Sequence, residues 1–258
     1  MARWTFFGRV LPERLPLRID PSITGHHEGG LGVCFDFTIG IADGQIAATI
    51  NSTGENQEVH TVRNAVENTI RNLTDVVGYL NGLSYDVEII SAACLDDGRQ
   101  CIFGPAIPVL AARHRSSGNQ LSSELLQAIA SDPAAQMALA HFREAMRIPV
   151  DTGFFCYRAI EAIMQSMKAD ESENEKTTWP RMHNALRIGP NPLFILKGHA
   201  DLPRHGKSSA ISDADRAKVF KIADEIIGRY LQFLIRGRTP LPEQEFPLFD
   251  NEEPLPAN

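Results

Sequence analysis

The chain has 258 residues, of which 43% are hydrophobic and 22% charged, and its formal net charge is −7. A chain of this length and apolar content can bury a sizeable core, and we expect two domains. Its longest apolar run, residues 101–112, is short and is interrupted by a glycine and two prolines, which excludes a membrane span. The N-terminus has charged residues too close together for a signal peptide, so we expect a cytoplasmic protein that contacts no membrane.

Residues 1–115 are predicted to form an antiparallel, β-rich domain with one long helix. Extended segments are expected around residues 4–7, 14–19, 32–41, 45–51, 85–95 and 100–110. The pair Asp43-Gly44 marks a tight turn that joins 32–41 and 45–51 into a hairpin, and Asp97-Gly98 marks a second hairpin between the last two segments. Within each hairpin, the two strands are expected to be adjacent and antiparallel.

A change of period marks the helix of this domain. Apolar residues recur every three or four positions from Val59 to Leu83, which predicts one amphipathic helix packed on the sheet. Four charged side chains of alternating sign stand four positions apart along it and are expected to face water: Arg63, Glu67, Arg71 and Asp75. Packing on the sheet explains this helix without any catalytic role.

Candidate metal ligands are few and scattered. The cysteines stand at spacings typical of neither a zinc site nor a disulfide framework, which predicts four reduced thiols: Cys34, Cys94, Cys101 and Cys156. The run His26-His27-Glu28 resembles the beginning of a metal site, but we favour a polar loop that meets solvent. No phosphate-binding glycine loop, HExxH or GxSxG motif occurs. We predict no metal and no cofactor.

Residues 121–238 are predicted to form an α-helical bundle, so the fold class is α+β. Helices are expected at 121–129, 133–146, 152–168, 179–188 and 212–236, with an exposed loop before the fourth that ends at a capping Thr178. The boundary between the domains is placed between Arg113 and Asp132. Residues 239–258 are predicted to be an acidic, proline-rich tail that covers a basic face of the bundle, or whose Phe246 and Phe249 dock on a partner.

The densest cluster of titratable side chains lies in the segment from His199 to Lys207, predicted to be a turn between two helices. His205 is a candidate acid or base, Arg204 a candidate phosphate or oxyanion ligand, and His199 a candidate second proton-transfer group. We favour a structural role, in which Arg204 pairs with Glu161 at the edge of a buried stripe of the third helix.

Positive charge gathers around this segment. Residues 178–238 hold eleven lysines and arginines against five acids, which is the pattern of a surface that binds a polyanion. The candidate binding residues are Arg181, Arg204, His205 and Lys207. A polyanion is the class of ligand that this charge favours.

The helix Tyr157 to Met167, a loop, a second helix and the segment ADLPRHGK before a long terminal helix resemble the HEPN superfamily, over about 151–236. The resemblance implies a helical domain that dimerises, binds nucleotides or acts as a metal-independent ribonuclease. Its nucleases carry an arginine and then four to six residues before a histidine, whereas Arg204 directly precedes His205 here. The opening FFGRVLPERLPL also resembles uncharacterised bacterial proteins labelled methylamine-utilisation accessory proteins.

The sequence leaves two hypotheses for function. The first is a non-catalytic binding or scaffolding protein whose HEPN-like helical domain dimerises or binds nucleotide or nucleic acid. The alternative is a metal-independent ribonuclease that uses Arg204, His205 and His199. The partners expected are a second copy of the chain and a nucleotide or RNA.

Overall fold

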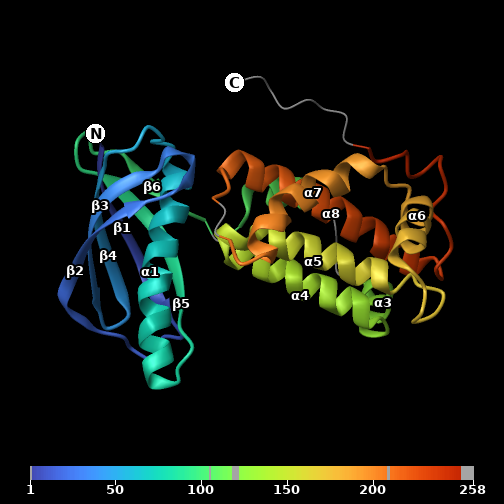
Figure 1. Ribbon diagram of the computed structural model, residues 1–258, viewed down its shortest axis with the longest axis horizontal. Coiled ribbons are helices and arrows are strands. Elements are labelled where there is room, and N and C mark those ends of the chain that lie inside the picture. The colour runs from blue at the N-terminus through green and yellow to red at the C-terminus, as the bar shows by residue number, and fades with distance from the viewer. Residues whose placement is uncertain (1, 105, 118–121, 208–209, 251–258) are drawn as a thin grey trace. The chain divides into compact units, whose positions relative to one another are not determined.

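The computed structural model describes residues 2–104, 106–117, 122–207 and 210–250, the side chains of 113–117 excepted. The fold is α+β and divides into two compact units, residues 1–105 with 210–213 and residues 106–209 with 214–258 (Figure 1). The division falls before residues 106–117, which the sequence had assigned to the N-terminal domain or the linker. No helix in the described ranges has both the length and the apolar character of a membrane span.

In the described part of the first unit, six strands form one antiparallel sheet in the order β2-β3-β4-β1-β5-β6. The strands are β1 (Ala2–Leu11), β2 (Ile19–Glu28), β3 (Cys34–Ala42), β4 (Gln45–Ser52), β5 (Asp86–Cys94) and β6 (Gln100–Ile102). The helix α1 (Val59–Asn81) packs across one face of this sheet (Figure 1). The long helix was predicted from Val59 to Leu83, and it ends at Gly82 in the left-handed conformation.

Alternation along the strands places the core between the sheet and α1. Phe6, Phe35 and Ile39 on the strands are buried against Val66 and Ile70 on the helix. Each fully buried side chain of this size contributes about 1.5–3 kcal/mol relative to an exposed one. The predicted β3–β4 hairpin is confirmed: Asp43 and Gly44 both have positive φ, 50° and 75°, as a two-residue turn with the twist of the strands requires.

Two of the predicted strands are wrong in their limits. The segment predicted at 14–19 belongs mostly to the connection before β2, and β2 continues through the supposed loop to Glu28. The strand predicted at 100–110 ends at Ile102, and a helix, α2 (Pro108–Ser117), begins at Pro108. Proline lacks the N–H that a strand ladder needs but is favoured in the first turn of a helix, so it decides this boundary.

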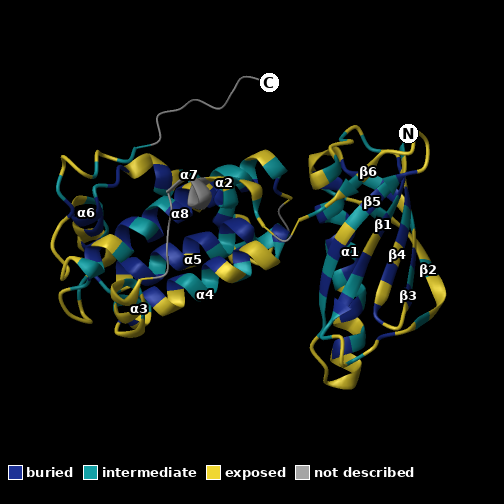
Figure 2. Ribbon diagram, turned by 180° about the vertical axis from the view of Figure 1, so that it is seen from behind, coloured by how far each residue is buried: buried dark blue, intermediate teal, exposed yellow. Residues whose placement is uncertain are grey.

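The described part of the second unit is helical. Besides α2 it contains α3 (Ser123–Ala130), α4 (Pro133–Arg147), α5 (Thr152–Gln165), α6 (Glu175–Leu186), α7 (Pro190–Arg204) and α8 (Asp213–Ile235), with a short 3₁₀ turn at Pro149–Asp151. The first unit has a 3₁₀ turn at Gly30–Gly32. Figure 2 shows buried residues concentrated on α5 and α8. Asp132 caps α4 by accepting a 2.7 Å bond from the backbone N–H of Ala135, and Pro133 follows it, as predicted.

Two predictions about the helices of this unit need correction. The cap of α6 is Asn174 and not Thr178, so the helix begins one turn earlier, inside the segment expected to be a loop. The helix α7 was not predicted, and His199 to Arg204 form its last turns where a turn between helices had been expected. Gly153 on α5 allows α7 to approach closely, because a Cβ there would lie 2.6 Å from the carbonyl oxygen of His199.

The segment after α8 is also part of this unit. Leu241 is buried, and its backbone N–H donates to the carbonyl of Ala185 at 2.9 Å. Residues 239–250 therefore pack against the helices, whereas the sequence had predicted a tail; residues 251–258 lie outside the described residues.

A candidate binding face on the N-terminal sheet

The face of the sheet opposite α1, called the open face below, carries small and polar side chains in rows that run across the strands. One row consists of threonines from four neighbouring strands, Thr24, Thr38, Thr49 and Thr5, which the strand register places side by side. The hydroxyl oxygens of Thr5 and Thr49 lie 3.1 Å apart. These positions alternate with the core residues, so no side chain of α1 reaches them.

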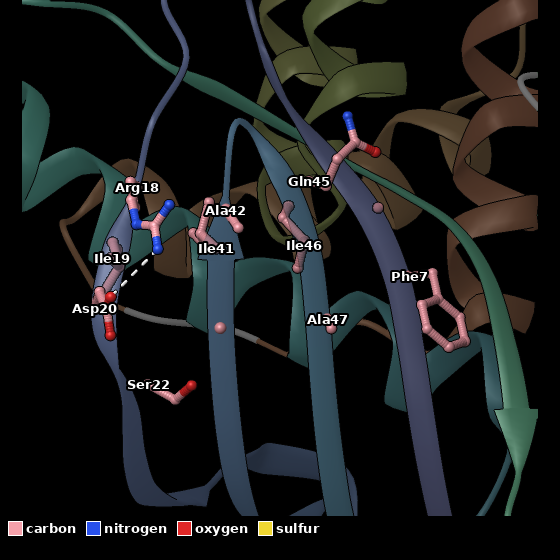
Figure 3. A pocket seen from close by; sticks show the side chains of 12 residues that line it. Phe7, Arg18, Ile19, Asp20, Ser22, Ile41, Ala42, Gln45, Ile46 and Ala47 are labelled. Atoms are coloured by element: carbon pink, nitrogen blue, oxygen red, sulfur yellow. Dashed lines mark hydrogen bonds and ion pairs between the residues drawn. The ribbon is translucent and has the colours of Figure 1, made fainter.

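The next row contains a hollow of about 500 Å³ (Figure 3). Gly40 and Ala47, opposite one another on β3 and β4, supply its floor, and the Phe7 ring on β1 stands at one side. Arg18 and Asp20, at the start of β2, border the other side, where their side chains form an ion pair of 3.4 Å. The hollow exists because glycine and alanine stand where larger residues would fill the face.

The arginines of the open face pair with acids. Arg9 donates to Glu88 at 2.8 Å, and this bond raises the pKa of Arg9 above its ordinary value. Arg3 donates to Asp96 at 2.8 Å and lowers the pKa of that carboxyl. Residues 1–105 hold seven arginines, no lysine and thirteen acids, so this unit is acidic. An uncharged ligand suits such a surface better than a polyanion does.

The run His26-His27-Glu28 does not form a joint site, because strand alternation turns the two histidines to opposite faces. His26 lies on the open face, where its Nδ1 is 2.8 Å from Asp36. His27 lies on the core side, stacked on Phe35 with ring centroids 4.6 Å apart, and burial lowers its pKa. Within the described residues, no three His, Cys, Asp or Glu side chains gather in an arrangement that could hold a metal.

Between α1 and β5 lies an ionic network whose burial the sequence did not predict. Glu67, expected to face water, is only 3% exposed and lies 2.7 Å from Arg63 and 3.3 Å from Arg71. Arg71 also pairs with Asp86, and the two arginines donate to the carbonyls of Ile89 and Val87 at 3.4 and 3.1 Å. The arginines thus extend from α1 to the backbone of β5, and the carboxylate between them is buried with its partners.

The predicted cluster at the end of α7 is only partly assembled. Arg204 Nη1 lies 3.4 Å from Glu161 Oε1, and the guanidinium lies 6.0 Å from the centre of the Tyr157 ring. Glu161 also accepts a 3.2 Å bond from Arg158. The side chain of Arg204 remains 45% exposed, His205 and Lys207 are exposed, and His199 is half-buried. The backbone of His205 ends the helix by donating to the carbonyl of Asp201.

The basic face is smaller than the charge count suggests. Arg216 and Arg229 on α8 are buried, and each donates to carbonyls at the C-terminus of another helix, Arg216 at α4 and Arg229 at α6. Arg181, a predicted binding residue, donates to Glu173 at 2.5 Å and to the carbonyl of Met167 at 2.8 Å. This ion pair lowers the pKa of Glu173 to about 2. The exposed cations that remain include Lys197, Arg204, Lys207 and Lys221.

Comparison with known proteins finds the same two-part organisation. Residues 4–103 match the N-terminal domain of a domain of unknown function, DUF8168, and residues 122–235 match the C-terminal domain of DUF8168. The first match covers the strands and α1, and the second covers α3 to α8. No curated protein and no solved structure matches the chain.

Proposed function

We propose that this chain, which matches both DUF8168 domains in order, is a non-catalytic binding protein whose recognition surface is the open face. The observation that supports this proposal is the hollow of about 500 Å³, with its small-residue floor, one aromatic wall and polar border. An apolar floor with a few polar groups at the edge is the usual composition of a ligand site. The paired charges around it favour an uncharged ligand, or an uncharged side chain of a protein, that stacks on Phe7.

The test is to fill the hollow and to remove its aromatic wall. A library of uncharged fragments is screened against the full chain by amide chemical-shift changes. We expect some fragments to bind and to shift the amide signals of Gly40 and Ala47. Gly40→Val fills the floor and Phe7→Ala removes the stacking surface, so each substitution should lower the affinity of these fragments at least about tenfold. Leu95→Ala, at an exposed leucine outside the hollow, is the matched control. Hits that bind Gly40→Val as well as wild type would refute the site.

For the helical unit we propose nucleotide or RNA binding at the end of α7. Exposed Arg204, His205 and Lys207 at one helix end support it, because exposed side chains of this kind can donate to phosphates. Fluorescence anisotropy with a labelled single-stranded RNA at low salt is the measurement. We expect binding that weakens with salt and with the Arg204→Ala/Lys207→Ala double variant, whereas Lys176→Ala on α6 should leave it unchanged.

The same samples test the ribonuclease alternative. Arg204 is held by Glu161 and directly precedes His205, which supports binding over hydrolysis. Cleavage of the RNA in the presence of chelator, abolished by His205→Ala or Arg204→Ala, would establish the nuclease and replace the binding proposal. RNA that is neither bound nor cleaved would exclude both.

We also propose that the chain forms a homodimer through α1. Three apolar side chains on its C-terminal half are exposed at helical spacing: Val76, Tyr79 and Leu80, which are 59%, 87% and 73% exposed. Leu83, just after the helix, is 39% exposed. Sedimentation should show a dimer that Leu80→Ser dissociates. A wild-type monomer at about 100 μM would contradict it, since a specific dimer of ordinary size forms well below that concentration.

A further inference from the structure

The segment after α8, residues 239–250, is called the strap below. Its backbone pairs with the turn between α6 and α7. The N–H of Phe249 donates to the carbonyl of Arg187 at 2.9 Å, and the N–H of Gly189 donates to the carbonyl of Phe249 at 2.8 Å. Ile188 and Phe249 thereby form a parallel bridge. The strap is held here as an added peptide strand would be.

Arginines hold the aromatic side chains of the strap. The Arg229 guanidinium, on a residue only 6% exposed, lies 5.9 Å from the Phe246 ring centre and 5.6 Å from that of Phe249. It also donates to the carbonyl of Pro247 at 2.9 Å. Arg236 lies 5.4 Å from the centre of the Phe246 ring, so this ring contacts two guanidinium groups.

The acids of the strap meet cations or a helix N-terminus. Glu243 lies 3.0 Å from Arg187, Glu245 pairs with Arg236, and Arg187 Nε donates to the carbonyl of Phe246 at 2.7 Å. Asp250 accepts a 3.2 Å bond from the backbone N–H of Asn191 in the first turn of α7. A Cβ on Gly189 would overlap the Asp250 carboxyl, so only glycine leaves room for it.

The strap contributes little to the helical core. After Leu241, none of its described residues is buried, and Glu243, Gln244, Glu245, Pro247 and Leu248 are exposed. The helix α8 has its own buried side chains, Tyr230 and Phe233 among them. The strap thus meets the helices through two phenylalanines, three acids and backbone bonds, which is how a peptide ligand contacts a receptor.

From these contacts we propose that the end of α6, the start of α7 and the last turns of α8 form a peptide-binding groove, which the strap fills as a tethered ligand. The groove takes an acidic peptide with two phenylalanines three positions apart and a carboxylate directly after the second. Arg229 and Arg236 recognise the first ring, Arg229 and the backbone of residues 187–189 recognise the second, and the N-terminus of α7 recognises the carboxylate.

The tether sets the design of the experiment. A segment joined to its own site has an effective concentration in the millimolar range, so the wild-type chain should exclude free peptide. The full-length double variant Phe246→Ala/Phe249→Ala releases the strap without altering the groove. Titrated with a fluorescent peptide of residues 239–250, this variant should bind at least about tenfold more tightly than wild type does.

Two controls make the result decisive. A peptide carrying Phe246→Ala/Phe249→Ala should bind the variant at least about tenfold more weakly, because it lacks both ring contacts. The chain with Leu248→Ala, at a strap side chain 59% exposed, should exclude the peptide as wild type does. If the double variant loses its helical circular dichroism, the strap is part of the core, and the proposal fails. A folded double variant that binds no peptide also overturns it.

Discussion

Glu67 lies where the charge pattern of α1 meets the backbone of β5. Its four-residue spacing from Arg63 and Arg71 is typical of a solvated helix face, and the sequence offered no sign that this face would turn toward a strand. Burial of the carboxylate follows from the position of β5 beside the helix, which depends on strand pairing distant in sequence. Side-chain spacing predicted the three partners, and the tertiary fold determined their burial.

Removal of this carboxylate should therefore be costly. Glu67→Ala leaves two guanidinium groups, 19% and 13% exposed, without their shared partner, and we expect a loss of about 3 kcal/mol of unfolding free energy. Urea unfolding measures it. Asp75→Asn, at an exposed position of the same helix, is the matched control and should change stability by less than about 0.5 kcal/mol. Equal effects of the two substitutions would show that Glu67 is solvated.

The predicted pair of Arg204 and Glu161 is more exposed than the Glu67 network and should contribute less to stability. Arg204 is 45% exposed and Glu161 also pairs with Arg158, so Arg204→Ala should cost only about 0.5 kcal/mol. A double-mutant cycle with Glu161→Ala measures the coupling between the two side chains. Coupling above about 2 kcal/mol would mean that the pair is desolvated in solution.

At the scale of elements, the sequence predicted those helices and hairpins whose formation depends on residues within one segment. The Asp43-Gly44 hairpin and the helix from Val59 depend on turn chemistry and periodicity within one segment. The helix α7 was not predicted because Pro190, Pro192 and Pro203 obscure its period, although two of these prolines lie in the first turn, where they are tolerated. The hollow could not be predicted either, since it depends on the register that places Gly40 beside Ala47.

The β2–β3 pair carries a pH-dependent contact. Burial lowers the pKa of His27 below its ordinary 6.5, so the unfolded chain binds a proton more readily than the native one. The neutral ring contributes fully to the free energy of unfolding above about pH 6.5. This contribution is lost as the pH falls from that value toward the lower native pKa. Urea unfolding between pH 7.5 and 5.5 should show a smaller loss of stability for His27→Phe than for wild type. An identical loss in both proteins would exclude this contribution; His141 and His183, whose pKa values burial also lowers, remain in both.

At the scale of the whole molecule, each unit has its own core and its own tryptophan. Trp4 is buried in the sheet core, and Trp179 on α6 stacks on Tyr157 in the helical unit, with ring centres 6.3 Å apart. The change from period two to helical periodicity placed a domain boundary between Arg113 and Asp132, whereas the structure divides before residue 106. The strap could not be assigned from the sequence, because residues 187–189, which its backbone contacts, are distant in sequence.

The two tryptophans can report on the units separately. Glu67→Ala should lower the urea midpoint followed through Trp4 in a Trp179→Phe background. In a Trp4→Phe background, the urea midpoint followed through Trp179 should be the same with and without Glu67→Ala, since substitutions in separate cores act independently. Equal shifts at both reporters would show that the chain unfolds as one cooperative unit.

The bonds from Arg63 and Arg71 to the carbonyls of Ile89 and Val87 also bear on aggregation. Between residues 86 and 89, within the part of the chain that the structure describes, the backbone of β5 pairs with β1 alone, because β6 pairs with residues 91–93 and the N–H of Phe103 donates to the carbonyl of Ile90. A sheet margin of this kind is a template on which a second chain can add and begin a fibril. The guanidinium groups bind carbonyl oxygens that an incoming strand would need as hydrogen-bond acceptors. Side chains, and not another strand, therefore satisfy these acceptors. A chain that lost both arginines would leave β5 open to the growth of amyloid.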